Sequence, residues 1–315
     1  MLQLRTTGYK ALDNLRLRME YPPRWNTMKE LEEVTDRFHA CFLAERHEVS
    51  RELGPGFLVP ELIDSAIRTT ETENMDRGNK TGSEKLQFVR ALHRMNSMMQ
   101  IYPRHIEILD PLIRETAGKG RNPARILEIA CGSGGLAFSL AEHARKNRID
   151  LAVTASDIVP EFISEGNRLA GERKLSVKFI PLNAFEMHGF GKNDFDITVM
   201  SQSLHHFSPG QLATIIAQAK KHTATAFVGI DGHRSILLLA GVPLIAGFQG
   251  MVPFAQDGLT SARKFYSDLE LEIIAGIATN DTNHHVGCSW PLTVLLARFD
   301  GRKAGAEGEA QGRNW

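Results

Sequence analysis

The sequence has few cysteines, no excess of charge of either sign and no apolar leader. Its three cysteines, Cys41, Cys131 and Cys288, are far apart and odd in number, which argues against a disulfide framework and against a zinc cluster. Lysine plus arginine equals aspartate plus glutamate at 37 each, so we expect no nucleic-acid partner held by a broad positive surface. Residues 1–20 lack the continuous apolar core of a secretory signal. A reducing, cytoplasmic location is the simplest expectation.

A long uninterrupted hydrophobic run is also missing. The most apolar stretch, residues 236–254, approaches the length of a membrane span but is broken by Pro243, Gln249 and Pro253. This pattern favours a buried or substrate-facing segment over an integral membrane span, although shallow membrane attachment stays open. We assign residues 232–260 to an insertion that forms part of a substrate pocket.

The first 120 residues have the apolar spacing of helices and form a helical accessory region. Thr81 and Glu84 have the spacing of a capping box, which predicts a helix start at residue 83. The polar stretch 69–82 is typical of a loop, and residues 117–123 of a linker. The predicted helices are residues 28–53, 60–67, 83–100 and 103–116.

From residue 124 short apolar runs alternate with helical stretches, which predicts a parallel sheet covered on both faces. The predicted strands are residues 125–129, 151–156, 176–182, 196–201 and 224–230. The helices between them are residues 135–147, 160–171 and 209–221. One further helix, residues 261–276, precedes two strands, 284–290 and 292–299, which follow each other too closely for a crossover and predict a hairpin. The domain thus covers residues 121–300, and residues 301–315 form a disordered tail.

A glycine-rich turn joins the first strand to the first helix of this domain. The segment from Ala130 to Gly135 lets the backbone approach a ligand closely, and the helix that follows offers free N–H groups. A nucleotide or nucleoside is the expected ligand. Gly132, Gly134 and Ala137 also satisfy the dinucleotide fingerprint, so an NAD(P)-dependent oxidoreductase stays open as an alternative.

Polar side chains follow the first three strands where a nucleoside would lie. Glu128 stands just before the glycine turn. Asp157 ends the second strand, where a carboxylate can bind both ribose hydroxyls. Asn183 ends the third strand, where an amide can contact an adenine edge.

The spacing of Glu128, Ala130, Gly132 and Gly134 resembles the first motif of class I S-adenosylmethionine-dependent methyltransferases, with Ala130 in place of the usual first glycine. Residues 195–207 (FDITVMSQSLHHF) look like the fourth-strand motif of that family, most of all in its ubiquinone/menaquinone-biosynthesis-like group. The resemblance implies an α/β, Rossmann-like, seven-stranded and mostly parallel sheet whose last strand is antiparallel. It also implies S-adenosyl-L-methionine as the cofactor.

The resemblance implies a role for each matching residue. The methionine part of the cofactor would lie against Glu128, Ala130, Gly132, Ser133 and Gly134. The ribose would bind Asp157, and the adenine would lie beside Ile158, Asn183 and Ala184. The floor of the cofactor site would be Ser201 and Gln202, and the helix before the domain would close over the cofactor with Tyr102 and Arg104.

Transfer of an activated methyl group needs alignment and exclusion of water, and it needs a general base only for some acceptors. Candidates for a base or an orienting group are His205, His206, Asp231 and His233, which follow two neighbouring strands. The histidine pair could instead anchor a loop, and the second pair could cap the next segment. No metal is expected, because the spacing of these residues matches no metal motif.

The sequence therefore predicts methyl transfer to a small, hydrophobic or aromatic molecule, by an enzyme that could be a homodimer. The acceptor pocket would lie between the helical first third and the apolar insertion, with Phe38, Phe42, Met95 and Met99 among its walls. Helix-spaced Met and Phe are also typical of a hydrophobic core. A non-catalytic relative of the same fold stays open as a second alternative.

Overall fold

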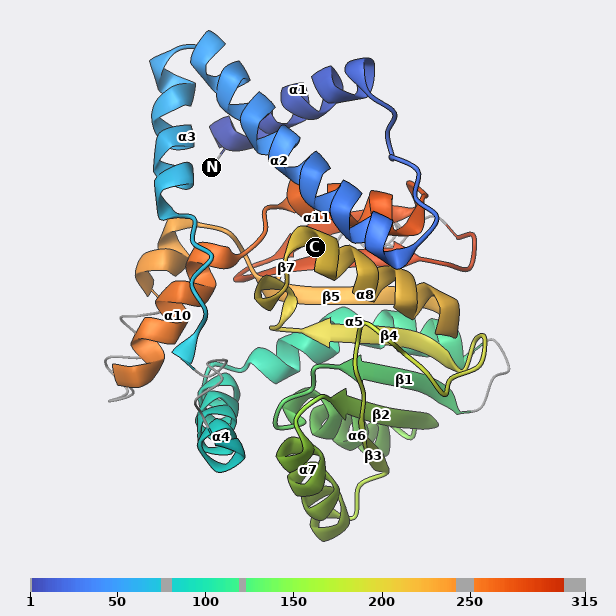
Figure 1. Ribbon diagram of the computed structural model, residues 1–315. Coiled ribbons are helices and arrows are strands. Elements are labelled where there is room, and N and C mark those ends of the chain that lie inside the picture. The colour runs from blue at the N-terminus through green and yellow to red at the C-terminus, as the bar shows by residue number, and fades with distance from the viewer. Residues whose placement is uncertain (1, 75–80, 119–122, 242–251, 303–315) are drawn as a thin grey trace.

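A seven-stranded β-sheet runs through the middle of the molecule, with helices on both faces (Figure 1). The computed structural model describes residues 2–74, 81–118, 123–241 and 252–302. The strands are β1 (Ala124–Ile129), β2 (Leu151–Asp157), β3 (Val177–Pro181), β4 (Phe195–Ser201), β5 (Thr223–Gly232), β6 (His284–Ser289) and β7 (Leu292–Arg298). Their order in the sheet is β3-β2-β1-β4-β5-β7-β6. The first five are parallel, and β7 is antiparallel to β5 and β6. The predicted seven-stranded sheet with an antiparallel last strand is confirmed.

Each face of the sheet is covered by helices that bury an apolar side. On one face lie α5 (Ile101–Ala117), α6 (Gly135–Asn147) and α7 (Pro160–Arg173), and on the other lie α8 (Pro209–His222) and α11 (Asp268–Thr279). Two hydrophobic cores fill the spaces between these helices and the sheet. Burial on both faces explains why strands such as β7 (LTVLLAR) are mostly apolar in the sequence.

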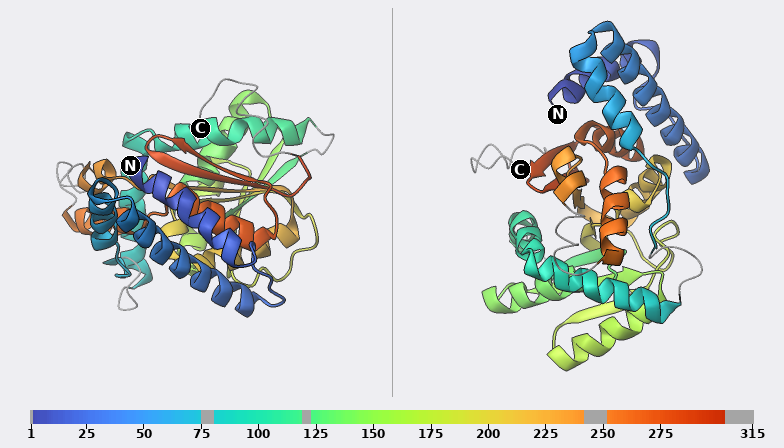
Figure 2. Two further views of the ribbon diagram at one scale, coloured as in Figure 1. Left: turned by 90° about the horizontal axis from the view of Figure 1, so that it is seen from above. Right: turned by 90° about the vertical axis from the view of Figure 1, so that its left-hand side faces the viewer.

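The helices of the first 120 residues do not form one layer. α1 (Leu2–Arg18), α2 (Met28–Glu52) and α3 (Pro55–Ile67) lie outside α8 and α11, whereas α4 (Gly82–Met98) and α5 belong to the opposite side of the sheet (Figure 2). The segment from Arg68 to Asn74 connects the two groups and passes the carboxyl ends of the strands, where it lines the cavity described below.

Two of the predicted helices differ from the structure, and one helix was missed. α3 begins at Pro55 rather than Pro60, because Gly54 adopts a φ of 91° and a proline is well suited to the first position of a helix. The single helix predicted over 261–276 is two helices, α10 (Val252–Lys264) and α11. They are separate because Ser267 caps α11, with its hydroxyl accepting the Glu270 N–H and the Glu270 side chain completing a capping box. Helix α1 was not predicted. The capping box at Thr81 is confirmed, and Ser208 forms a second one with Gln211 at the start of α8.

The apolar stretch 236–254 is described only in part. Residues 236–241 are helical and expose Leu237, while residues 242–251 lie outside the described residues, as do 119–122 of the expected linker and 303–315 of the expected tail. No helix in the described parts of the chain has both the length and the apolar character that crossing a membrane requires.

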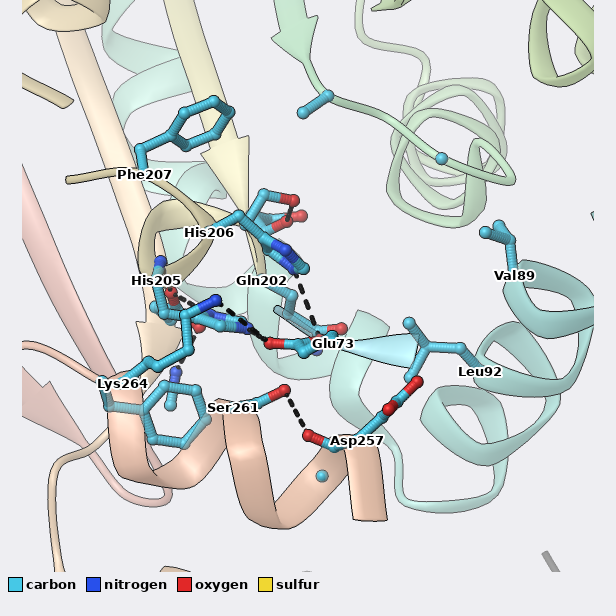
Figure 3. Close-up of a pocket in the computed structure, with 18 of the residues that line it drawn as sticks. Glu73, Val89, Leu92, Gln202, His205, His206, Phe207, Asp257, Ser261 and Lys264 are labelled. Atoms are coloured by element: carbon cyan, nitrogen blue, oxygen red, sulfur yellow. Dashed lines mark hydrogen bonds and ion pairs between the residues drawn. The ribbon is translucent and has the colours of Figure 1, made fainter. Parts of the chain in front are cut away.

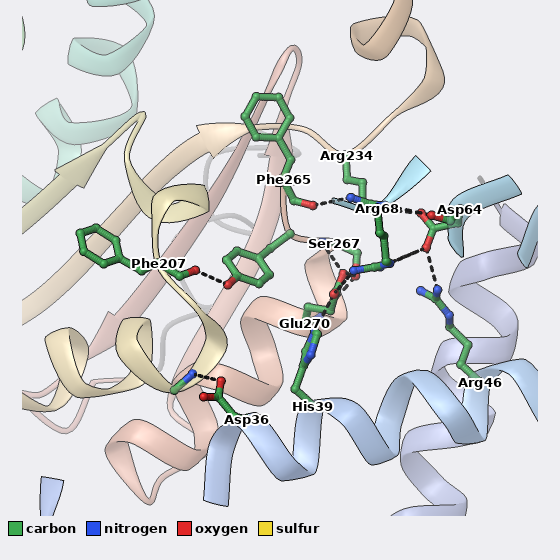
Figure 4. A network of polar contacts seen from close by, with 12 residues as sticks. Asp36, His39, Arg46, Asp64, Arg68, Phe207, Arg234, Phe265, Ser267 and Glu270 are labelled. Atoms are coloured by element: carbon green, nitrogen blue, oxygen red, sulfur yellow. Dashed lines mark hydrogen bonds and ion pairs between the residues drawn. The ribbon is translucent and has the colours of Figure 1, made fainter. Parts of the chain in front are cut away.

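A buried network of ion pairs connects helices α2 and α3 to the sheet domain (Figure 4). Arg68, which follows α3, lies 2.7 Å from Glu270 of α11 and 3.0 Å from Asp64 of α3. Arg234, which follows β5, lies 2.7 Å from the other oxygen of Asp64. His39 of α2 also lies 2.7 Å from Glu270. Because these groups are largely buried, they fix how the N-terminal helices sit on the domain.

Candidate functional site

A cavity of about 1340 Å³ opens at the carboxyl ends of β1, β2, β4 and β5. In open α/β sheets, ligands bind at this edge because the loops there leave a crevice between neighbouring strands. Helices α4, α5 and α10 and the segment from Arg68 to Glu73 form the remaining walls. The volume exceeds the roughly 300–1,000 Å³ that a single small-molecule ligand typically occupies, so the cavity has room for two molecules.

The glycine turn forms one end of this cavity. Ala130, Gly132 and Gly134 have φ values of 54°, 53° and 74°, in the left-handed region. Ala130 and Gly132 line the cavity, together with Ser133. Gly134 is needed for another reason: a Cβ there would lie 2.4 Å from the ring of Phe179 on β3, so this glycine permits packing of the turn against the sheet.

Glu128, on β1 just before the turn, carries an unusual carboxyl group. It is 2% exposed and lines the cavity, and its Oε2 atom has no hydrogen-bond partner. Burial, reinforced by the negative charge of Asp157, raises the pKa of Glu128 to about 8. A buried carboxyl oxygen without a partner is well suited to receive a cationic or hydrogen-bonding group of a ligand.

Asp157 holds the turn and faces the cavity at the same time. Its two carboxylate oxygens accept the N–H groups of Gly132 and Val159 at 2.9 and 3.0 Å. Ile158 lines the cavity and is 66% exposed. Asn183 and Ala184 are not among the cavity walls, and the Asn183 side chain accepts the N–H of Phe185 at 3.1 Å in a local turn.

Helices α4 and α5 close the cavity from the side opposite the sheet edge. The Tyr102 hydroxyl lies 2.9 Å from Nδ1 of His93, and the Asn96 amide donates to the side-chain oxygen of Gln202 at 2.7 Å. Tyr102, Ser201 and Gln202 all line the cavity. Arg104 does not, because its guanidinium donates to the backbone oxygen of Trp290.

The histidine pair lies at the other end of the cavity, on the 3-10 helix η2 (Leu204–His206). Nδ1 of His205 lies 2.8 Å from the Asp231 carboxylate, which also accepts the backbone N–H of His205 at 3.0 Å. Burial lowers the pKa of His205, but the Asp231 and Glu73 carboxylates outweigh this effect and raise that pKa to about 9. His233 lies outside the cavity walls, 2.8 Å from the Thr293 hydroxyl.

Several wall residues were not predicted from the sequence (Figure 3). Glu73 stands in a polar stretch that is typical of a loop, with no signal that its carboxyl group would be 3% exposed and next to both histidines. Val89 and Leu92 of α4 and Lys264 of α10 face the same cavity. Their contribution depends on how distant helices pack, which helical spacing does not reveal.

The comparisons with known proteins agree with this geometry. Residues 126–225 match the family model of a methyltransferase domain. The plantazolicin methyltransferase BamL, solved with a substrate analogue and S-adenosylhomocysteine, is 16% identical with a TM-score of 0.51 over 68% of this chain and 90% of that one. A putative O-methyltransferase from Nostoc punctiforme is 17% identical with a TM-score of 0.50, over 80% and 72% of the two chains. A putative methyltransferase from Methanococcus maripaludis is 13% identical with a TM-score of 0.50, over 73% and 95%. No curated protein matches the chain.

The matched domain and the sheet order are those of a class I methyltransferase. The chain carries this S-adenosylmethionine-dependent methyltransferase domain, with its glycine turn inside the matched residues. The expected methyltransferase activity and cofactor are thereby confirmed. The dinucleotide fingerprint within the turn belongs to this domain, which leaves the oxidoreductase alternative without support.

Proposed function

We propose that this enzyme methylates a small hydrophobic or aromatic molecule that binds in the same cavity as the methyl donor. The observation that carries this proposal is the cavity itself, with a glycine turn at one end and a histidine pair at the other. A volume of about 1340 Å³ is sufficient for a donor and an acceptor side by side.

The turn end of the cavity suits S-adenosylmethionine. The cofactor supplies a methyl group on a cationic sulfur and also carries an ammonium group. Glu128 offers a buried carboxyl oxygen without a partner, which fits a cation, and Asp157 presents its carboxylate beside the turn. We assign the donor to Glu128, Ala130, Gly132, Ser133, Asp157, Ile158, Ser201, Gln202 and Tyr102.

Four residues predicted for the donor take other places in this proposal. Gly134 supports the packing of the turn, and Arg104 holds the segment at Trp290. Asn183 and Ala184 stand outside the described cavity, so we assign adenine recognition to Ile158 instead.

The end of the cavity opposite the glycine turn has apolar walls that suit a hydrophobic acceptor. Leu92, Met95 and Met99 of α4 and the loop after it face the cavity, as does Phe207, whereas Val89 lies against Gly132 at the turn. Phe38 and Phe42 were predicted as pocket walls, but they are buried in the core between α2 and the sheet domain. The walls of the acceptor site therefore come mainly from α4 and α10, and α2 contributes His39 and Leu43 rather than Phe38 and Phe42.

His205, His206 and Asp231 are the polar groups at the acceptor end. The Asp231 carboxylate fixes the ring of His205, so that the Nε2 atom faces the cavity side. We assign His205 and His206 to orientation of the acceptor and Asp231 to positioning of His205. His233 is assigned no role at the acceptor, because it lies outside the cavity walls.

The first experiment measures donor binding by calorimetry with S-adenosylhomocysteine and, separately, with NAD(H). We expect S-adenosylhomocysteine alone to bind, and Asp157→Ala to weaken its binding by at least about tenfold, since that change removes one charged contact. Asp13→Ala, at an exposed ion pair on α1, is the matched control and leaves binding unchanged. Equal affinity in both variants would contradict the assigned donor site.

The second experiment identifies the class of acceptor. The enzyme is incubated with S-adenosylmethionine carrying a labelled methyl group and with a cell extract separated by size and polarity. Label recovered in small, organic-soluble molecules supports the proposal. Label found only in macromolecules or only in polar metabolites would overturn it.

A further inference from the structure

Three side chains with metal-ligating atoms converge at the acceptor end of the cavity. Glu73 comes from the segment between α3 and α4, and His205 and His206 come from η2. Nε2 of His205 lies 3.3 Å from one oxygen of Glu73, and Nε2 of His206 lies 3.9 Å from the other (Figure 3). One ligand atom from each residue falls within 4.8 Å of the other two.

The cluster is buried and its polar groups are incompletely matched. Glu73 is 3% exposed and His205 is 6% exposed. Oε1 of Glu73 and Nε2 of His205 face each other at 3.3 Å as an ion pair, but neither atom makes a hydrogen bond of good geometry. Buried polar atoms are nearly always hydrogen-bonded in folded proteins, so this pair is better suited to share a bound cation than to bind each other.

The surroundings of His205 resemble those of a metal-bound histidine. Its Nδ1 atom lies 2.8 Å from the Asp231 carboxylate, which fixes the ring with Nε2 toward Glu73. Histidines that bind metals usually donate their other N–H to such a carboxylate. The rings of His205 and His206 lie 4.4 Å apart at an angle of 34°, so both can direct Nε2 toward the same carboxylate.

We propose that Glu73, His205 and His206 form a binding site for a divalent transition-metal ion such as Zn²⁺. Two imidazoles and one carboxylate suit Zn²⁺, Fe²⁺, Mn²⁺ or Co²⁺. In a tetrahedral site with bonds of ~2.0–2.1 Å, neighbouring ligand atoms are about 3.4 Å apart, and the Glu73–His205 distance of 3.3 Å matches this separation. The ion replaces the proton on Nε2 of His205.

An ion bound at this site would keep an open coordination position on the side of the acceptor. All three ligands line the cavity, and three protein ligands leave at least one coordination position open. An ion held there would bind a hydroxyl oxygen of an acceptor and lower the pKa of that hydroxyl, so that its proton is lost to solvent; the oxygen would then take the methyl group and S-adenosylhomocysteine would leave. This second step rests on the proposed function, whereas metal binding itself does not.

The ammonium group of Lys264 is a second cation that could neutralise Glu73 in place of a metal ion. Its ammonium nitrogen lies 3.7 Å from Oε1 of Glu73 and is 14% exposed. If the cluster served only as an ion-pair network, Lys264 and the two histidines would balance Glu73 and no metal would bind. If it is a metal site, Lys264 competes with the ion for the carboxylate, and its removal favours the ion.

The test uses the full chain after dialysis against a chelator, without methyl donor. Zn²⁺ binding is measured by calorimetry, and Co²⁺ binding by the visible absorption bands that appear on coordination by nitrogen ligands. We expect one ion per chain. Glu73→Gln should weaken binding at least about 100-fold, because loss of even an outer partner of a metal ligand costs 10–100-fold. Lys264→Gln should tighten it.

Glu71→Gln is the matched control, because Glu71 stands on the same segment, 3.8 Å from Arg263 and outside the cluster. It should bind the ions as the unaltered chain does. Absence of Zn²⁺ and Co²⁺ binding, equal affinity in Glu73→Gln, or weaker binding in Lys264→Gln would each overturn the proposal. Calorimetry with S-adenosylhomocysteine on the same samples reports an intact donor site in Glu73→Gln. It also separates failure of the metal site from failure of the methyltransferase assignment.

Discussion

Replacement of Glu128 by glutamine should make the ligand-free protein more stable and the donor complex weaker. Glu128 is 2% exposed, and burial raises its pKa from an ordinary value near 4.5 to about 8. The folded chain therefore holds a proton that the unfolded chain has lost at neutral pH. Glutamine has nearly the same shape and carries no charge, so Glu128→Gln removes the need to take up that proton.

The magnitude follows from proton linkage. Because the folded pKa lies above the unfolded one, the carboxyl group lowers stability increasingly as the pH rises from about 4.5 to about 8. Each pH unit in this window costs about 1.4 kcal/mol. The cost is of order 1 kcal/mol near pH 5, about 3 kcal/mol near pH 7 and about 5 kcal/mol above pH 8. Glu128→Gln should recover these amounts.

The assay is urea unfolding of both proteins at three pH values, followed by calorimetry with S-adenosylhomocysteine. The gain in stability should grow with pH, while affinity falls by about 10–100-fold, because a charged hydrogen bond to the ligand is lost. Glu142→Gln, at a half-exposed position on α6, serves as the control and should change neither quantity by much.

The reasoning would be refuted by a stability difference that does not vary with pH. In that case Glu128 would be ionised in the folded state and balanced by a group that the described residues do not show. Unchanged affinity for S-adenosylhomocysteine, together with the expected gain in stability, would instead show that Glu128 is buried but does not contact the donor.

Two further predictions concern packing and charge. Gly134→Ala should lower the free energy of unfolding by about 2–4 kcal/mol, because residue 134 has a left-handed backbone and the new Cβ would lie 2.4 Å from Phe179. Thermal unfolding measures this effect, with Gly171→Ala as the control because open space surrounds that glycine. Glu270→Gln should destabilise the chain by about 3–5 kcal/mol at neutral pH, because it removes the buried carboxylate that Arg68 and His39 share and leaves Arg68 paired with Asp64. The pKa of Glu270 is well below its ordinary value, so the stability that its ionised carboxylate contributes should fade as the pH falls through the acid range. An equal loss of unfolding free energy in Glu270→Gln at acid and neutral pH would contradict this account.

Most of the sheet could be predicted because its signals are local. Strands buried on both faces give short, mostly apolar runs, and capping residues such as Thr81 and Ser208 mark helix starts directly. Helix α1 gives a weak signal, because its buried positions are interleaved with polar ones on a largely exposed helix. The break before α11 depends on Ser267, whose capping role was hidden within a helical pattern.

The candidate site could be predicted only where it follows the strands. Residues at the carboxyl ends of neighbouring parallel strands meet, and the contact between His205 and Asp231 is an example. Glu73 reaches the same place from a segment between two helices, and no periodicity predicts such a path. Arg104 was predicted to close over the cofactor because its helix lies beside the cavity, but its side chain extends to Trp290 instead.

The ionic network between α3 and α11 limits how this enzyme can be dissected. A fragment that begins at residue 121 would keep Glu270 and Arg234 but lose Arg68, Asp64 and His39. It would also expose the apolar faces of α8 and α11 that α2 covers. Such a fragment should aggregate on expression, and exchange of substrate-binding helices between related enzymes should succeed only when both halves of the network are transplanted together.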